Sequence, residues 1–235
     1  MALDARANLD LVDAATGRLL DTLAGLTDQQ ARAASGLPGW SRGHLLSHLA
    51  RNADGMRNLL HWARTGEVRP MYREPDGRDA DIESGSSRPA GELAADVGEA
   101  AGRWAVAAGE LSEENWRTEI RRRPGNPPEP AWNLIDGRLF EVEFHHVDLD
   151  LGYRFADSPA ELVDRALAST HGRLVPEQPF VAVLDGGRRL DFTGDRRSEL
   201  EVHGSAAAML GWLTGRATGS DLRVSGGVLP TLPAW

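Results

Sequence analysis

Two residues of metal-binding type, Glu141 and His145, stand four positions apart in a segment with helical periodicity. The apolar residues of this segment recur at helical rather than strand spacing, which predicts a helix; they are Leu134, Leu139, Val142, Val147 and Leu151. Side chains four apart lie on one face of a helix, about 5–6 Å from each other. A carboxylate and an imidazole at this spacing predict two ligands of a divalent metal ion.

A third ligand has to come from another segment, and we expect it to be His48. This histidine lies in a second predicted helix, which begins after an N-cap at Ser41 and ends near Thr65. Taken singly, His48 is more typical of a core histidine, and Glu141 with His145 of a surface ion pair. If the pair is buried, an uncompensated carboxylate is costly, and a divalent cation removes that cost.

Two histidines and one carboxylate leave one coordination position open, as in catalytic rather than structural zinc sites. Iron, nickel or manganese also accept these ligands. His146 and Asp148 are candidate hydrogen-bond partners of the ligands. Because His146 points about 100° away from its neighbour on a helix, the alternative is that it faces solvent.

The composition is that of a globular protein, with 235 residues of which 41% are hydrophobic and 26% charged. A formal charge of −9 disfavours nucleic acids and anionic membrane surfaces as partners. No apolar run approaches the roughly 18 residues of a membrane span, and the N-terminus lacks the pattern of a signal peptide. We therefore expect a cytoplasmic protein.

The sequence contains no cysteine. Disulfides, a cysteine nucleophile and cysteine-ligated zinc are therefore excluded for this chain. Any thiol chemistry has to use a thiol supplied by another molecule.

Amphipathic periodicity predicts four helices in the first two thirds of the chain, which would pack as a bundle with a site in its core. A breaker-rich stretch, residues 66–89, is expected to be a loop of the kind that forms lids or binding loops, and it carries Arg78. Residues 116–132 are expected to be irregular or a short hairpin. The predicted helices are residues 3–26, 41–65, 89–111 and 133–152.

The pattern changes after about residue 153, where short strands alternate with helices. We expect a helix over 160–175, a hairpin over 180–193, a strand over 199–203, a helix over 204–214 and a last strand over 222–225. The predicted fold class is α + α/β, with a four-helix bundle over residues 1–155 and a small α/β domain over 156–235.

Four segments resemble the mycothiol-dependent maleylpyruvate isomerase family, and the similarity extends over nearly the whole chain. They are WSRGHLLSHLARNADGMRNLLHW (residues 40–62), RDADIE (78–83), EVEFHHVDL (141–149) and GWLTGR (211–216). The resemblance implies a DinB-like four-helix bundle that carries zinc, followed by a domain similar to sterol carrier proteins.

The resemblance also implies roles for individual residues. It makes His48, Glu141 and His145 the zinc ligands. It gives Arg78 and an arginine of the C-terminal domain contacts with the thiol or the substrate, and Arg216 is the better candidate for the latter, with Arg223 as the alternative. His48, Arg78 and Arg216 are thereby the expected catalytic residues.

The implied reaction converts maleylpyruvate to fumarylpyruvate with zinc and mycothiol as cofactors. The thiolate adds to the double bond, the bond rotates, and elimination restores the thiol. The expected partners are a dicarboxylate substrate and a low-molecular-weight thiol, with no nucleic acid or membrane, and the expected protein is a monomer. Three alternatives remain: a mycothiol S-transferase, a zinc hydrolase and a non-catalytic ligand-binding regulator.

Overall fold

A computed structural model describes residues 5–72, 77–123 and 125–233. The chain forms two compact units, Met1–Leu151 and Gly152–Trp235. Within the described ranges, no helix is long and apolar enough to cross a membrane.

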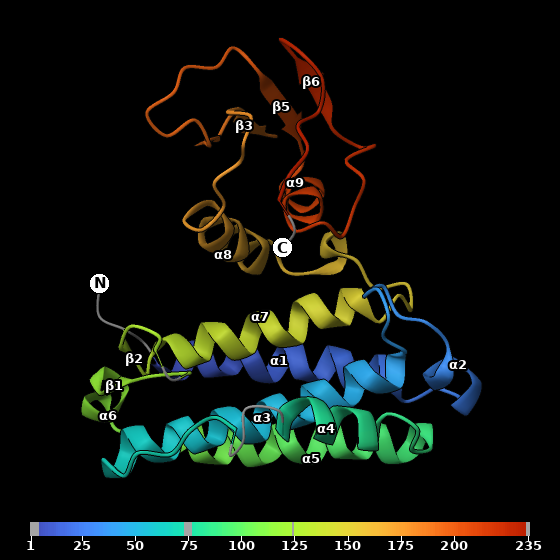
Figure 1. The fold of residues 1–235 in the computed structure, drawn as a ribbon, viewed down its shortest axis with the longest axis vertical. Helices are drawn as coiled ribbons and strands as arrows, with labels where there is room; N and C mark the ends of the chain where they lie inside the picture. Colours follow the sequence, from blue (N-terminus) through green and yellow to red (C-terminus); the bar gives the residue numbers. More distant parts are fainter. Residues whose placement is uncertain (1–4, 73–76, 124, 234–235) are drawn as a thin grey trace. The chain divides into compact units, whose positions relative to one another are not determined.

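The N-terminal unit is a bundle of four long helices that run side by side (Figure 1). They are α1 (Ala5–Leu23), α3 (Arg42–Thr65), α5 (Ala90–Gly109) and α7 (Asn133–Asp148). Each buries an apolar stripe, and residues such as Leu19, Leu49, Val97 and Leu139 have almost no exposed surface. The predicted four-helix bundle is therefore confirmed.

Short elements connect the long helices, and one of them corrects the sequence prediction. Part of the predicted loop over residues 66–89 is a helix, α4, which lies against α3. This stretch has glycine at both ends and only weak apolar periodicity, a pattern that is typical of a loop. The short elements are α2 (Asp28–Arg32), α4 (Gly77–Gly85), α6 (Glu113–Arg117), and the antiparallel pair β1 (Glu119–Ile120) and β2 (Glu129–Pro130).

Helix α3 has well-defined ends, as its sequence predicts. The Ser41 side chain accepts a hydrogen bond from the backbone N–H of His44, and the His44 ring accepts one from the N–H of Ser41, which makes a reciprocal cap. Gly66 adopts φ = 77° at the C-terminal end, a conformation that suits glycine. The caps fix where the helix begins and ends, and the buried residues of α3, among them Leu45 and Leu49, set the face that His48 shares.

Helix α4 approaches α3 closely through two glycines. A Cβ atom at Gly43 would lie 2.1 Å from the carbonyl oxygen of Ser86, and one at Gly85 would lie 2.7 Å from Oγ of Ser47. Both distances are far below van der Waals contact, so larger residues would force the backbones apart. The glycines therefore allow α4 to lie directly on α3.

The C-terminal unit has a mixed four-stranded sheet in the order β4-β3-β5-β6. Strands β3 and β5 are parallel, and the two outer pairings are antiparallel. Its elements are η1 (Phe155–Asp157), α8 (Ala160–His171), β3 (Val181–Leu184), β4 (Arg189–Asp191), β5 (Glu201–Gly204), α9 (Ala206–Leu213) and β6 (Arg223–Ser225). A small α/β domain after a helical bundle confirms the predicted fold class.

The close contact of α3 and α4 gives a first prediction. Gly43→Ala should destabilise the protein by about 1–3 kcal/mol, since its methyl group would overlap the Ser86 carbonyl. Gly17→Ala is a matched control: it lies inside α1 with no atom within 4 Å of the added methyl. That substitution should raise stability by about 0.5–1 kcal/mol. Urea unfolding midpoints of the three proteins check this, and an equal midpoint for Gly43→Ala and the wild type would contradict it.

Candidate metal centre

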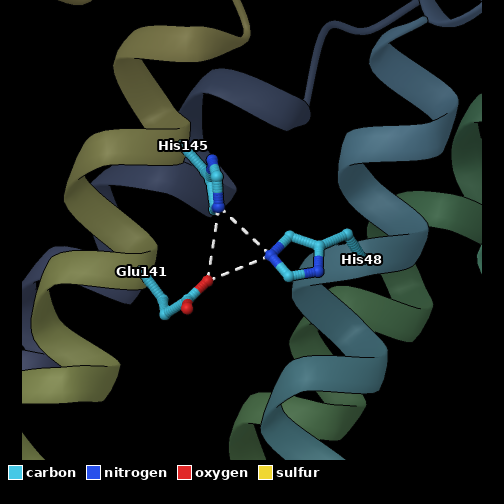
Figure 2. Close-up of side chains that lie close together, drawn as sticks. All are labelled: His48, Glu141 and His145. Carbon is cyan, nitrogen blue, oxygen red and sulfur yellow. Dashed lines mark hydrogen bonds and ion pairs between the residues drawn. The ribbon is translucent and has the colours of Figure 1, made fainter. Parts of the chain in front are cut away.

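Helices α3 and α7 bring His48, Glu141 and His145 together in the bundle (Figure 2). Nε2 of His48 lies 3.0 Å from Oε2 of Glu141 and 3.1 Å from Nε2 of His145. The third side of this triangle, from Nε2 of His145 to the same carboxylate oxygen, is 3.3 Å. Glu141 and His145 of α7 and His48 of α3 thus lie close together, as the sequence predicted.

The triangle has dimensions that suit a metal ion. Zinc binds imidazole nitrogen and carboxylate oxygen at about 2.0–2.1 Å, so two ligand atoms of a tetrahedral site are about 3.3–3.4 Å apart. The separations in this cluster, 3.0 to 3.3 Å, need only a small expansion to reach that geometry. Two imidazoles and a carboxylate also fit iron, nickel or manganese by donor type.

Burial and mutual hydrogen bonds set the charges of the three side chains. Burial by itself would raise the pKa of Glu141, but hydrogen bonds with His145 and His48 outweigh it and hold that pKa well below its ordinary range. Burial lowers the pKa of His48. Burial opposes charge on His145 too, yet hydrogen bonds to Asp148 and Glu141 raise its pKa above the ordinary value. The cluster is therefore built to hold an ionised carboxylate.

Asp148 orients one of the imidazoles. Its Oδ2 lies 2.8 Å from Nδ1 of His145, and the side chain of Asp148 is only 2% exposed. A carboxylate at Nδ1 keeps the hydrogen on that nitrogen and directs the lone pair of Nε2 toward the centre of the triangle. The same arrangement supports the ligand histidines of many metal proteins.

For His146 the sequence left two roles open: a hydrogen-bond partner of the predicted ligands, or a residue that faces solvent. It is 1% exposed, so the solvent-facing alternative is wrong. Its Nε2 lies 2.8 Å from Oγ1 of Thr22 on α1. It therefore contributes to the α1–α7 contact.

Arg78, at the start of α4, reaches the cluster. Its Nη2 lies 3.2 Å from Nδ1 of His48, and its Nη1 lies 2.6 Å from a carboxylate oxygen of Asp79. The guanidinium carbon is 5.8 Å from the centre of the Trp40 ring, within the range of a cation–π contact. Trp40 also lies against His48, with 5.6 Å between ring centroids. These contacts put a cation and an aromatic wall beside the predicted ligands.

Sequence reasoning gave no role to Trp40 or to Arg138, a fully buried arginine on α7. The position of each residue in the sequence could have indicated that it lies near the cluster. Trp40 directly precedes the N-cap of α3, and Arg138 stands three residues before Glu141, on the same helical face.

The C-terminal arginines lie in the second unit. Arg216 follows α9, where its Nη1 donates a hydrogen bond to the carbonyl of Thr214. Arg223 lies on β6 with an exposed side chain. Their assignment to the site stays a prediction.

The N-terminal unit is thus a helical bundle with a cluster of two histidines and one carboxylate that could hold a metal ion, and the C-terminal unit is a small α/β domain. The family model of the mycothiol maleylpyruvate isomerase N-terminal domain matches residues 12–150, and that of the C-terminal domain of the same enzyme matches residues 157–234. The chain therefore belongs to the mycothiol maleylpyruvate isomerase family, a family of enzymes of the isomerase class.

Two crystal structures of mycothiol-dependent maleylpyruvate isomerase are similar along the whole chain. One is 29% identical, and the other, of a histidine-to-alanine variant, is 28% identical. Both have a TM-score of 0.90 and cover 99% of this chain and 98% of their own. No curated protein sequence matches significantly.

Removing a ligand should remove the metal. We expect wild-type protein to purify with near-stoichiometric metal, and His48→Ala and Glu141→Ala to lose most of it, because two ligands hold a divalent ion far less tightly than three. His61→Ala is a control on the same helix, since its ring pairs with the exposed Glu67. Elemental analysis by mass spectrometry measures the content, and equal metal in wild type and both ligand variants would contradict the assignment.

The stability of the metal-free protein and that of the metal-bound protein should change with pH in opposite directions. In the metal-free protein, the raised pKa of His145 means that the folded state holds a proton which the unfolded state has released above about pH 6.5. Stability then falls as pH rises from about 6.5 through the folded-state pKa. The pKa of His48 is lowered, so the protonation of His48 affects stability only below about pH 6.5. With metal bound, protonation of His145 is blocked, so stability should rise with pH.

Thermal melting between about pH 6.5 and 8.5, in chelator and in excess zinc, measures the two slopes. Slopes of the same sign would contradict the prediction. His171→Ala is a control, because this histidine lies in the C-terminal unit and bonds the carbonyl of Asp191.

Proposed function

We propose that this chain converts maleylpyruvate to fumarylpyruvate, with zinc held by His48, Glu141 and His145 and with mycothiol as the thiol. The observation that carries the proposal is the meeting of these three side chains in a member of this family. The two similar crystal structures support it, since both are of an enzyme with that activity in its name.

The donor set and its separations fit a divalent ion, which when bound would supply Lewis acidity and lower the pKa of a thiol. The thiol comes from outside the chain, because the sequence contains no cysteine. Glu141 contributes one negative charge, so a divalent ion held there would keep a net positive charge that favours a thiolate. Asp148 keeps His145 in the tautomer that binds through Nε2.

Arg78 is the residue that we assign to the carboxylate groups of the substrate. An arginine only donates hydrogen bonds, so its contact with Nδ1 of His48 uses the lone pair of that nitrogen. A neutral His48 that binds metal through Nε2 carries its hydrogen on Nδ1 and cannot accept from Arg78. The guanidinium is then available for a carboxylate, to which it can donate two parallel hydrogen bonds.

The chemistry of the substrate explains why a thiol is needed. Rotation about a carbon–carbon double bond is too slow to be useful, whereas rotation about a single bond is fast. Addition of the thiolate to one alkene carbon makes the bond single and moves the electron pair into the adjoining carbonyl as an enolate. After rotation, the enolate expels the thiolate, and the double bond returns with trans geometry. Arg78 opposes the negative charge of the enolate.

One chain supplies all three ligands from α3 and α7, so we expect a monomer to hold the metal. Arg216 is proposed as the second carboxylate contact, with Arg223 as the alternative. Three alternatives differ from the isomerase in what they consume: a thiol S-transferase, a zinc hydrolase and a ligand-binding regulator. One experiment can therefore separate them.

The experiment measures maleylpyruvate turnover with and without mycothiol and the thiol concentration over time. We expect turnover only with thiol, fumarylpyruvate as the product and no loss of thiol. Arg78→Met should lower kcat/KM by about 100-fold while metal content is unchanged. Arg69→Met is a matched control, since this exposed arginine pairs with Glu67 and not with the cluster.

Each other outcome contradicts the isomerase in a distinct way. Stoichiometric thiol loss would identify a transferase, and turnover without thiol a hydrolase. Metal binding with neither turnover nor any effect of Arg78→Met would leave a regulator.

A further inference from the structure

Arg138 is a charged residue with no exposed surface, in the core of the bundle. It stands on α7 one turn before Glu141, on the face that meets α3. Arginine is rarely buried so completely unless it has a specific partner. The proposed reaction gives it no role.

The hydrogen bonds of Arg138 join the two helices that carry the metal ligands. Its Nη1 donates to the backbone carbonyl of Leu49 and to Oδ1 of Asn52, each at 3.1 Å. Leu49 directly follows His48 on α3, and Asn52 lies one turn further along. The guanidinium therefore connects the turn of α7 next to Glu141 with the turn of α3 next to His48.

These hydrogen bonds do not make Arg138 a net stabilising residue for the folded protein. Both acceptors are neutral, and Nε and Nη2 have no hydrogen-bond partner among the described residues. Burial lowers the pKa of Arg138 to about 10, with the charges of Glu141 and Asp54 acting in the opposite direction. A buried cation held this way costs free energy that an apolar side chain would not. What the residue does provide is a rigid, directional link between the helices.

We propose that Arg138 is a positioning residue for the metal centre, which sets the spacing of α3 and α7 at the level of the three ligands. The inference rests on the proposed function, because it assumes that the cluster binds a metal. Since no part of Arg138 is exposed, it acts through His48 and Glu141 and not by contact with the substrate.

Two effects of removing Arg138 oppose each other. The loss of a nearby positive charge would by itself favour binding of a cation. The loss of the link lets the ligand helices shift, and the loss of residues that orient ligands typically weakens metal binding 10–100-fold. We expect the loss of the link to dominate, because the two hydrogen bonds of Arg138 hold the turn of α3 next to His48. Weaker binding is the expected net result.

The test is titration with Co²⁺ of metal-free wild type, Arg138→Met and Arg138→Lys, followed by visible spectroscopy. Arg138→Met fills a similar volume without donors. It should raise the Kd for Co²⁺ about tenfold or more and alter the ligand-field bands, which report coordination geometry. Arg138→Lys keeps the charge and one donor group, so it should recover part of the affinity.

Arg18→Met is the matched control. Arg18 of α1 pairs with the buried Glu143 on another face of α7, so its loss also disturbs a buried charge next to this helix. It should lower the melting temperature but leave the Kd and the spectrum of the Co²⁺ protein unchanged.

The outcomes separate this inference from the proposed function. If wild type binds no Co²⁺, the metal centre itself is wrong. If wild type binds and Arg138→Met has the same or a lower Kd with an unchanged spectrum, Arg138 has only a structural role and the inference fails. Equal loss of affinity in Arg138→Met and Arg18→Met would also overturn it, because the effect would then be general destabilisation.

Discussion

The structure depends on one electrostatic constraint: an ionised carboxylate, Glu141, lies between two imidazoles inside a helical bundle. Burial alone would favour its neutral form, and the hydrogen bonds and charges of His145 and His48 reverse that preference and lower the pKa of Glu141. Those hydrogen bonds require a fixed distance between α3 and α7, because the two imidazole nitrogens and the carboxylate oxygen lie within 3.3 Å of each other.

Several features around the cluster serve that purpose. The cap at Ser41 fixes the start of α3, seven residues before His48, and the carboxylate of Asp148 orients the ring of His145. Gly43 lets α4 lie directly on α3, which brings Arg78 to the ring of His48. A helix placed slightly farther away could not deliver a guanidinium to hydrogen-bonding distance, so the contact at this glycine and the chemistry of the site are linked.

The sequence predicted the parts of this design that follow from local periodicity. The spacing of Glu141 and His145 shows on any helical projection, and the four amphipathic stripes are strong enough to predict a bundle. Helix α4 was missed because its sequence has glycines at both ends and little apolar periodicity, so its helicity depends on packing against α3. The burial of Arg138 was missed for a related reason: arginine in a helix is usually exposed, and only tertiary structure places Leu49 and Asn52 opposite it.

The same charges bear on how a substrate reaches the site. The chain carries a formal charge of −9, so at long range it repels a dicarboxylate. Salt at physiological strength screens that repulsion beyond about 8 Å. Recognition therefore depends on short-range groups, and within the N-terminal unit the cation that contacts the cluster from α4 is Arg78. For the proposed dicarboxylate substrate, contact with the site would therefore decide recognition more than attraction from a distance, which makes the orientation of Arg78 more important than the net charge.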